Sequence, residues 1–367
     1  MEVSMKYRKL VCMGIIIISA MIVAGGISFL QNRRERQFQP IGQAKAVDEP
    51  YYGPGVVNRA KPAGIVAGIY VKTKGILVLE VTRVWNETTY QEPAKGILKK
   101  GDYLLRCNGI QLQKKEDLSK ALQESGGKAV NLKINRDGKE KWVKVRPVKQ
   151  DGTYHIGCWV RDDMAGIGTI TLCTSQNTFV ALGHCISDMD LNEKVRIREG
   201  SLHPCSLTDI RKGKKNQPGA LIGYIDYRPE EPVGKILQNS PNGIYGKLLQ
   251  QPVFMEEEEY LPLAKRSQVH TGKAELISDF SGKRKRYSLN ITHINHFNRM
   301  DSKGFVIEIT DPRLLKKTGG IVQGMSGSPI IQDGRIVGAI THVLVHDSKK
   351  GYGIFVRDML KNTGKQY

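Results

Sequence analysis

Residues 319–331 are Gly-Gly-Ile-Val-Gln-Gly-Met-Ser-Gly-Ser-Pro-Ile-Ile, and this stretch decides the fold. Ser326 is followed by a glycine and preceded by another two positions earlier. A serine nucleophile needs an exposed Oγ on a tight turn, with backbone N–H groups beside it to hold an oxyanion. Glycines permit that backbone and remove side chains from the path of a substrate. Glycine-serine turns are also common in β-proteins, so the alternative is a surface hairpin.

We predict Ser326 as the nucleophile and the N–H groups of Gly324 and Ser326 as the oxyanion hole. Ser328 is excluded because the following Pro329 restricts it to an extended conformation. Losing one oxyanion donor typically slows turnover by about 100- to 1,000-fold.

A second stretch, residues 179–188, is Phe-Val-Ala-Leu-Gly-His-Cys-Ile-Ser-Asp. It places His184 after an apolar run and a glycine, upstream of the serine. The order of histidine before serine is that of chymotrypsin-like proteases. We predict His184 as the general base, with His342 as the second candidate; the alternative is a histidine satisfied within the core.

A third member of a triad should be an acid that orients the imidazole. Asp311 is one candidate, although Asp followed by Pro312 is also typical of a helix N-cap with proline at N1. Asp226 lies between His184 and Ser326 in the chain and competes with it. The spacing does not choose between them. Asp188 and Asp190 follow His184 so closely that we interpret them as turn residues.

The chain has 367 residues, a formal net charge of +20, 40% hydrophobic and 25% charged residues. A basic protein binds nucleic acid, anionic lipid or acidic polypeptide. No helix-turn-helix, zinc-finger or RNA-binding signature is present, so we expect no nucleic-acid partner. An anionic membrane surface fits better.

Cysteine and histidine residues do not predict a metal site. The pairs His184-Cys185 and His203-Pro204-Cys205, with Cys158 and Cys173, match no common zinc spacing. No cysteine pair forms a Cys-x-x-Cys motif, and an odd number lies outside the apolar N-terminal run, so no disulfide framework is indicated. We predict neither metal nor cofactor.

The N-terminal region predicts a membrane anchor. Residues 10–30 carry no charge and, at 1.5 Å per residue, span a hydrocarbon core of roughly 30 Å. Residues 1–36 are therefore expected to be a cytoplasmic tail and an uncleaved signal anchor that exports the following domains. Residues 37–60, rich in Pro and Gly, are expected to be a flexible linker.

Residues 61–148 resemble a PDZ domain. The most specific part is Leu-Lys-Lys-Gly-Asp-Tyr-Leu-Leu-Arg-Cys-Asn-Gly at residues 98–109, followed by one helix face at Leu118, Ala121 and Leu122. This resemblance implies that a peptide adds by β-augmentation beside a loop that holds its terminal carboxylate. That loop is expected at Ala67, Gly68, Ile69, Tyr70 and Val71. The alternative is a PDZ-shaped spacer without a ligand.

Residues 149–367 contain many short apolar runs separated by Gly, Pro, Asn and Asp. This is the pattern of an all-β barrel or sandwich. Helices are expected only at residues 312–317 and 357–361. The predicted fold is therefore mainly β, with a transmembrane anchor, a small α+β PDZ domain and an all-β protease domain.

The two motifs, the anchor and a PDZ domain ahead of the protease together resemble the SpoIVB family of sporulation serine peptidases. The resemblance implies a chymotrypsin-like double β-barrel with Ser326 as nucleophile, His184 as base and Asp311 as acid. The order of domains differs from HtrA-type proteases, in which PDZ domains follow the protease. Cys185 stands where an aliphatic residue is expected in this family.

The resemblance also implies a role. Such an enzyme is exported from the forespore into the space between the two sporulation membranes and cleaves itself near the N-terminal linker. It cleaves a membrane-bound regulator of an intramembrane metalloprotease, which activates the late mother-cell sigma factor. Its PDZ domain binds the C-terminus of the target or the enzyme's own N-terminal region. The alternatives are a PDZ-based binding protein with a gated or inactive protease domain and a general envelope quality-control protease.

Overall fold

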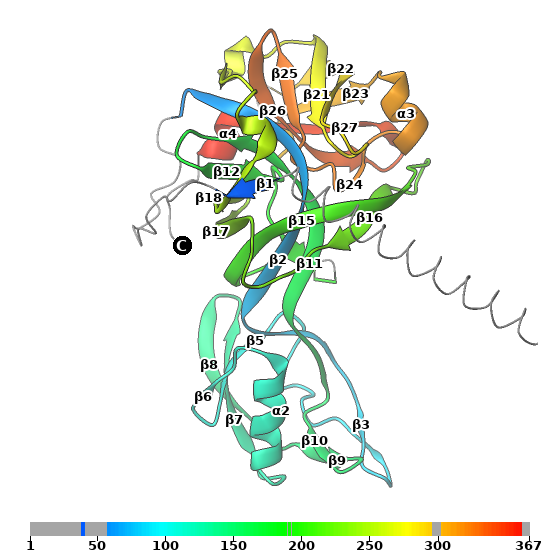
Figure 1. Ribbon diagram of the computed structural model, residues 1–367. Helices are drawn as coiled ribbons and strands as arrows, with labels where there is room; N and C mark the ends of the chain where they lie inside the picture. The colour runs from blue at the N-terminus through cyan, green and yellow to red at the C-terminus, as the bar shows by residue number, and fades with distance from the viewer. Residues whose placement is uncertain (1–37, 41–56, 189, 192, 296–301, 362–367) are drawn as a thin grey trace, which may run out of the picture.

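The computed structural model describes residues 38–40, 57–188, 190–191, 193–295 and 302–361 as two lobes joined by two long strands (Figure 1). The predicted membrane span at residues 10–30 lies outside these residues. Within them, no helix is long and apolar enough to cross a membrane.

We call residues 74–162 the small lobe and the remaining described residues the large lobe. The two joining strands are β2 (Arg59–Val81) and β11 (Cys158–Cys173), which pair antiparallel. The other elements of the small lobe are β3 (Val84–Trp85), β4 (Tyr90–Gln91), β5 (Tyr103–Cys107), β6 (Ile110–Gln111), α2 (Lys115–Glu124), β7 (Val130–Arg136), β8 (Lys139–Val145), β9 (Val148–Gln150) and β10 (Thr153–His155).

The large lobe contains two barrels. The first part of this lobe contains β1 (Phe38–Pro40), β12 (Thr178–Ala181), β13 (Ser187–Asp188), β14 (Glu193–Lys194), β15 (Ile197–Arg211), β16 (Gly219–Ile225), β17 (Gly234–Ser240), β18 (Gly243–Leu248), β19 (Gln250–Pro252), η1 (Val253–Met255), β20 (Leu261–Pro262) and η2 (Arg266–Gln268). The second part contains β21 (Gly272–Ser278), β22 (Lys285–Ile294), β23 (Phe305–Ile309), α3 (Pro312–Thr318), β24 (Val322–Gln323), β25 (Pro329–Gln332), β26 (Arg335–Leu344), β27 (Asp347–Phe355) and α4 (Val356–Leu360).

The first barrel is a ring of pairings that returns to its starting strand. β2 pairs with β11, then β12, β18, β17 and β15 follow, and β15 pairs with β2 again. Its interior is apolar and includes Ile65, Ile69, Phe179 and Leu202. The second barrel is closed in the order β21-β22-β23-β27-β26-β25. The predicted mainly β double-barrel architecture is therefore present.

A single glycine lets β2 serve both lobes. Up to Thr73 the strand pairs with β15, and from Ile76 it pairs with β5. Gly75, between them, has φ +93°, and a Cβ there would lie 2.7 Å from the carbonyl oxygen of Leu104. The glycine makes a kink inside one strand, β2, rather than ending it. The boundary between the lobes therefore falls within β2 rather than at residue 61.

The structure corrects the predicted carboxylate-binding loop. Ala67, Gly68, Ile69, Tyr70 and Val71 lie in the middle of β2, with β11 on one side and β15 on the other. Both edges of this stretch are already paired, so it has no free edge for a peptide. The predicted loop is wrong because these residues belong to a strand that is buried on two sides, and such a strand has a continuous run of apolar residues.

The expected linker is also shorter than predicted. Residues 38–40 form β1, which pairs antiparallel with β19, and Phe38 is buried in the first barrel's core. At the other end β2 already begins at Arg59. Residues 41–56 lie outside the described part of the chain.

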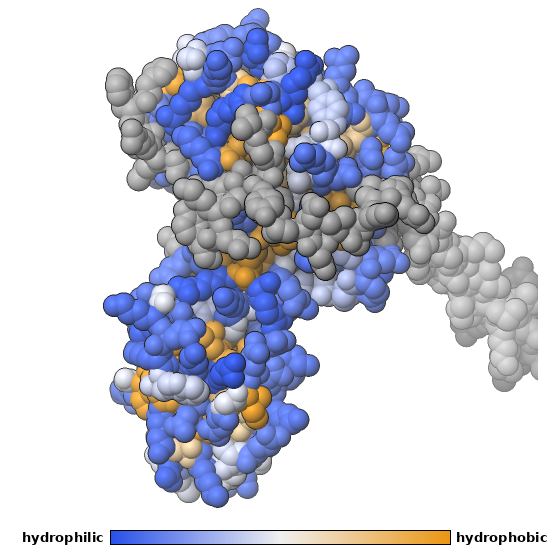
Figure 2. Space-filling view, turned by 90° about the vertical axis from the view of Figure 1, so that its left-hand side faces the viewer, coloured by the Kyte–Doolittle hydropathy of each residue, from blue (hydrophilic) through white to orange (hydrophobic). Residues whose placement is uncertain are grey.

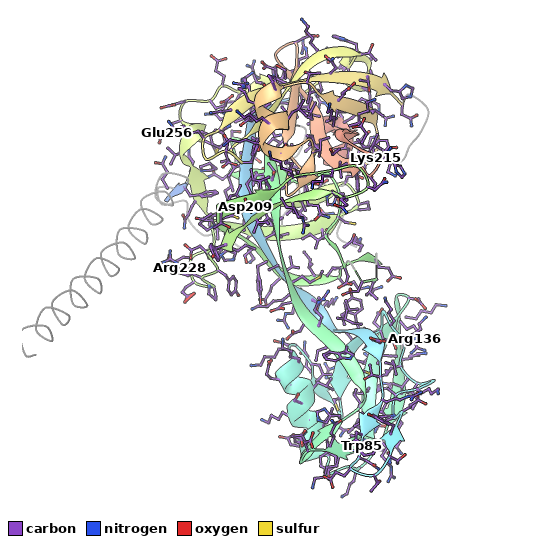
Figure 3. All side chains as sticks on the ribbon, turned by 90° about the vertical axis from the view of Figure 1, so that its right-hand side faces the viewer. Trp85, Arg136, Asp209, Lys215, Arg228 and Glu256 are labelled. Atoms are coloured by element: carbon purple, nitrogen blue, oxygen red, sulfur yellow. The ribbon has the colours of Figure 1, made fainter. Side chains whose placement is uncertain are left out.

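Hydrophilic side chains cover most of the face shown in Figure 2, with apolar groups showing in limited areas. In the small lobe a buried ion pair supports the core: the Arg136 guanidinium contacts Asp102 twice, at 2.7 and 2.6 Å, and the Ile97 carbonyl at 2.8 Å (Arg136 is labelled in Figure 3). Asp102 is fully buried, so this pair keeps the carboxylate satisfied in a lobe whose helix α2 buries Leu118, Ala121 and Leu122.

Candidate active site

The serine loop, residues 324–328, is fixed by backbone contacts with both barrels. Thr169 of β11 donates its N–H to the Ser326 carbonyl at 3.0 Å and its hydroxyl to the Gly324 carbonyl at 2.7 Å. Gly327 donates to the Ile340 carbonyl at 2.8 Å. These bonds set the peptide planes on both sides of Ser326. The oxyanion role of the Gly324 and Ser326 N–H groups stays a prediction.

Gly327 is required by close packing. Its φ is +96°, and a Cβ would lie 2.1 Å from the carbonyl oxygen of Thr169 and 2.6 Å from the N of Leu182. No side chain fits at that distance from backbone atoms. The glycine therefore lets the serine loop lie directly against the chain that leads to His184.

The histidine loop, residues 182–188 and 190–191, begins with an unusual backbone. Leu182 has φ +71° and Gly183 has φ +77°. The left-handed conformation costs a residue other than glycine about 1 to 3 kcal/mol and is concentrated at functional sites. A Cβ on Gly183 would lie 2.9 Å from the Thr341 side chain of β26. The loop is thus pressed onto the strand that the serine loop also contacts.

Ser326 and His184 meet at β26. The Ser326 hydroxyl donates to the Thr341 carbonyl at 2.7 Å, and the His184 ring lies 5.1 Å from that of His342, centroid to centroid. No hydrogen bond joins Ser326 to His184 among the described residues. Ser326 and His184, predicted as nucleophile and base, therefore contact adjacent residues of one strand, without the hydrogen bond that a reacting pair needs.

The His184 ring has a defined tautomer. Its Nδ1 lies 2.8 Å from the Cys185 carbonyl oxygen, which only accepts, so Nδ1 carries the proton. Nε2 is then the basic nitrogen. Burial lowers the pKa of His184, and the Cys185 carbonyl opposes this by favouring the charged ring. A neutral imidazole with Nε2 unprotonated is the form that a general base requires.

His342, the second candidate base, is held neutral. Its side chain is exposed at one edge, yet desolvation of the ring, with the charges of His184 and Lys303, lowers its pKa to about 4. The sequence does not predict that His342 lies beside His184. Thr169, which holds the serine loop, was missed altogether because a threonine inside an apolar strand carries no signal of that role.

Asp311 has partners other than His184. Its carboxylate accepts from the N–H groups of Ser288 and Arg313 at 3.2 and 2.9 Å, and from the Arg313 guanidinium at 2.7 Å. It is the N-cap of α3, with proline at N1. The Arg313 guanidinium, despite burial of the carboxyl, lowers the pKa of Asp311 to about 2. These contacts are those of a helix cap; its role as triad acid stays a prediction of the family resemblance.

The other acidic candidates have partners of their own. Asp226 ion-pairs with Arg228 at 3.4 Å. Burial lowers the pKa of the nearby His203, and the negative charge of Asp226 offsets only part of that shift. Asp188 accepts from the N–H groups of Asp190 and Leu191, as expected of a turn residue. In the described part of the chain, no group of three His, Cys, Asp or Glu side chains is arranged to hold a metal ion.

Comparison with protein families identifies the large lobe. The family model of SpoIVB peptidase S55 matches residues 152–360, which is more than half of the chain. The chain belongs to the SpoIVB peptidase S55 family. It is a serine endopeptidase, as the serine and histidine motifs predicted. The model of the Tricorn protease PDZ domain matches residues 85–150, so the small lobe of this peptidase is a PDZ domain.

Solved structures resemble the family member only remotely. The active form of Rv3671c protease from M. tuberculosis is 13% identical, with 56% of this chain and 76% of that chain covered and a TM-score of 0.32. The HtrA-type protease AlgW with a decapeptide is 9% identical, with 82% and 63% covered and a TM-score of 0.32. The PDZ domain of an SdrC-like protein from Listeria monocytogenes is 18% identical, with 24% and 90% covered and a TM-score of 0.20. No curated protein sequence matches the chain.

Proposed function

We propose that Ser326 attacks the carbonyl carbon of a peptide bond and that Nε2 of His184 accepts the proton of its hydroxyl. The observation that carries this is the meeting of both residues at Thr341 and His342, with the Nδ1–H of His184 donating to the Cys185 carbonyl so that Nε2 is free to accept a proton. The peptide bond breaks as the imidazolium returns the proton to the leaving amine. The Cys185 carbonyl then accepts the hydrogen bond from Nδ1–H that the carboxylate of a Ser-His-Asp triad accepts.

In this geometry the Ser326 hydroxyl is not placed to react with a substrate. The Ser326 hydroxyl donates to a carbonyl, so it must turn away from Thr341 before it can donate to His184. Catalytic hydrogen bonds commonly form only when substrate binds. A protease that waits for its substrate suits a narrow role better than general digestion.

The PDZ domain offers an edge for a peptide at a place that the sequence did not indicate. In the small lobe, Cys158–Asp163 of β11 pairs with β2, while the pairing with β12 on the same strand begins only at Ile170. Helix α2 packs beside β11, as a PDZ groove requires. We place the C-terminal peptide of a target, or the enzyme's own N-terminal region, between Trp159 and α2.

The biological setting is part of the proposal. A membrane anchor at residues 10–30 would hold the exported lobes at the forespore membrane, facing the intermembrane space. The enzyme would cleave itself near residues 37–60, and then a membrane-bound regulator of an intramembrane metalloprotease. Activation of the late mother-cell sigma factor would follow. The apolar run and the family membership support this assignment.

The test compares the full chain in detergent with Ser326→Ala and Ser328→Ala, using mass spectrometry of fragments released over time. Removing the nucleophile of a triad costs about a million-fold in turnover, so Ser326→Ala should release none. Ser328 is the matched control: it is fully buried, and its hydroxyl has no hydrogen-bond partner among the described residues. Ser328→Ala should cut like the wild type.

Two outcomes would contradict the proposal. Equal fragments from wild type and Ser326→Ala would show that another group, or a contaminant, does the cutting. Fragments from neither, with a peptide still bound by the PDZ domain, would favour the binding protein with an inactive protease domain.

A further inference from the structure

The turn that follows His184 is closed by one buried carboxylate. Asp188 is 1% exposed, and its Oδ1 accepts from the N–H groups of Asp190 and Leu191 at 2.8 and 3.0 Å. Its other oxygen, Oδ2, accepts from Nη1 of Arg161 at 2.5 Å. The histidine loop therefore ends on an ion pair in which the carboxylate is wholly buried.

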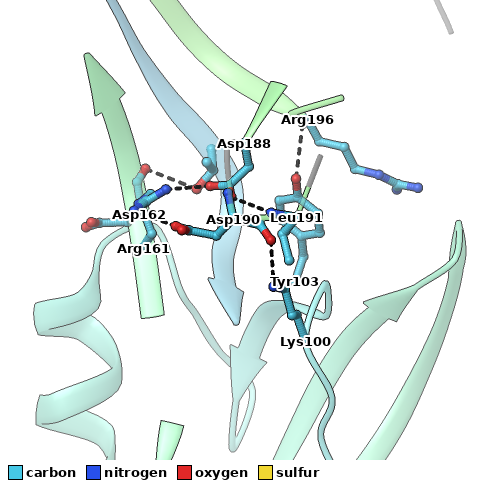
Figure 4. Close-up of polar contacts among 9 residues, drawn as sticks. Lys100, Tyr103, Arg161, Asp162, Asp188, Asp190, Leu191 and Arg196 are labelled. Atoms are coloured by element: carbon cyan, nitrogen blue, oxygen red, sulfur yellow. Dashed lines mark hydrogen bonds and ion pairs between the residues drawn. The ribbon is translucent and has the colours of Figure 1, made fainter. Parts of the chain in front are cut away.

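Arg161 belongs to the small lobe. It lies on β11, opposite Leu77 of β2, and its second nitrogen, Nη2, contacts Asp190 at 3.1 Å. Lys100, in the loop before β5, donates to the Asp190 carbonyl at 2.6 Å. Figure 4 shows Arg161 between the two aspartates, with Lys100 reaching the same turn from below. Lys100 of the PDZ domain and Arg161 of the joining strand β11 thus hold the turn that follows His184.

The segment between β14 and β15 is tied to the small lobe as well. The Arg196 N–H donates to the Tyr103 hydroxyl at 3.2 Å, and its carbonyl accepts from the Lys74 N–H at 2.8 Å. Both ends of the segment from Asp188 to Arg196 therefore contact the PDZ domain.

We propose that Arg161 and Asp188 are positioning residues for His184, through which the PDZ domain sets the place of the catalytic base. The proposal rests on the proposed role of His184. The imidazole is bonded to Cys185 within its own loop, so a shift of the turn carries the ring with it. A displacement of about 1 Å in a reacting group costs about 100-fold in rate.

The same residues give the peptide groove a route to the base. Asp162, the neighbour of Arg161, accepts from the Lys115 N–H at the start of α2 at 2.9 Å. The edge strand and the helix that flank the groove are thus joined directly beside Arg161. A peptide that separates or tightens them moves the residue that holds the histidine loop.

The experiment measures how fast a fluorophosphonate probe labels Ser326 in the full chain in detergent, with the rate at saturating probe separated from probe affinity. Arg161→Ala and Asp188→Asn should each lower the saturating rate at least tenfold and leave affinity unchanged. Asp188→Asn keeps the turn bonds through its amide oxygen and removes only the charge. The double variant should be no worse than Arg161→Ala alone, because the contact between Arg161 and Asp188 is already lost in that variant.

Arg286→Ala is the control for the loss of an arginine from an ion pair elsewhere, since Arg286 pairs with Glu275 at 3.0 Å on the second barrel, where the two side chains are 47% and 48% exposed. It should label like the wild type. Amide hydrogen exchange of residues 184–191 gives a readout that does not need activity, and in Arg161→Ala it should speed up there while exchange in the second barrel stays at the wild-type rate.

The outcomes separate the two proposals. Wild-type rates and unchanged exchange in Arg161→Ala and Asp188→Asn would overturn the positioning role and leave the proposed function standing. A wild type that the probe never labels at Ser326 would sink the proposed function, whereas faster exchange in Arg161→Ala would still uphold the mechanical link.

Discussion

The serine loop and the histidine loop meet at the same strand, but they are held in different ways. Backbone groups of Thr169 and Ile340, together with the Thr169 hydroxyl, fix the serine loop within the large lobe. The histidine loop has backbone bonds as well, but it also depends on side chains from two places, Asn239 in the first barrel and Arg161 on β11. Backbone contacts follow from the fold and cannot be substituted away singly. The difference teaches that the serine loop is built into the double barrel, whereas the histidine loop depends in addition on individual side chains.

The strongest way to break this comparison is to push the serine loop off its backbone contacts. Gly327→Ala places a Cβ against the Thr169 carbonyl and the Leu182 N, so the loop must move. A movement of about 1 Å should lower turnover by about 100-fold or more. Rates of fragment release and of probe labelling measure the loss.

Gly334→Ala is the control for backbone strain alone. Its φ of +68° is as unfavourable for alanine, but nothing lies within 4 Å of the added Cβ. Its activity should stay at the wild-type level. Equal losses in both variants would mean that strain, and not the contact with Thr169, explains the effect.

A smaller loss of turnover should distinguish the ways in which the two loops are held. Asn239 makes three hydrogen bonds, with the N–H and carbonyl of Ile186 and the carbonyl of Val195, at 2.8 to 3.0 Å. Asn239→Ala leaves these backbone groups unpaired, each costing about 1 kcal/mol or more. We expect about a tenfold loss of turnover.

Thr169→Val is the matched change on the serine side. It removes one hydroxyl bond to Gly324 and keeps the backbone bond to Ser326, so about a fivefold loss is expected. Steady-state kinetics on both variants decide the ranking. A Thr169→Val loss larger than that of Asn239→Ala would reverse the comparison.

The sequence could predict what periodicity and turn residues encode. Leu118, Ala121 and Leu122 were expected on one helix face, and they are the buried residues of α2. The helix at residues 312–317 was expected after Asp311, and α3 begins there. Both features arise within a few residues of chain, where local propensity decides.

Features that join distant segments could not be predicted. β2 was divided between a loop and a strand because an apolar run with Gly75 inside it resembles two elements around a turn. Its partners β11 and β15 lie about a hundred residues away in sequence. The contact of Arg161 with Asp188 is likewise invisible, because in a chain with 25% charged residues no pattern selects one pair.

The smallest expected effect concerns Asp311, and it tests whether His184 is also held from the second barrel. If the Asp311 carboxylate oriented His184, the histidine would not depend on Asn239 and Arg161 alone. As the cap of α3, Asp311→Ala should destabilise the protein by about 1 kcal/mol, and Asp311→Asn should spare most of this because asparagine caps equally well. Thermal unfolding measures both. Because the pKa of the folded Asp311 carboxyl is lowered to about 2, its stabilising charge contribution is fully present above the unfolded pKa near 4. That contribution is lost as the pH falls from about 4 through the folded pKa of about 2.

Turnover supplies the second criterion for Asp311: a triad acid replaced by its amide loses about ten-thousand-fold in turnover without unfolding. A loss of that size in Asp311→Asn would restore the acid that the family resemblance implies, and it would require α3 to release the carboxylate when substrate binds.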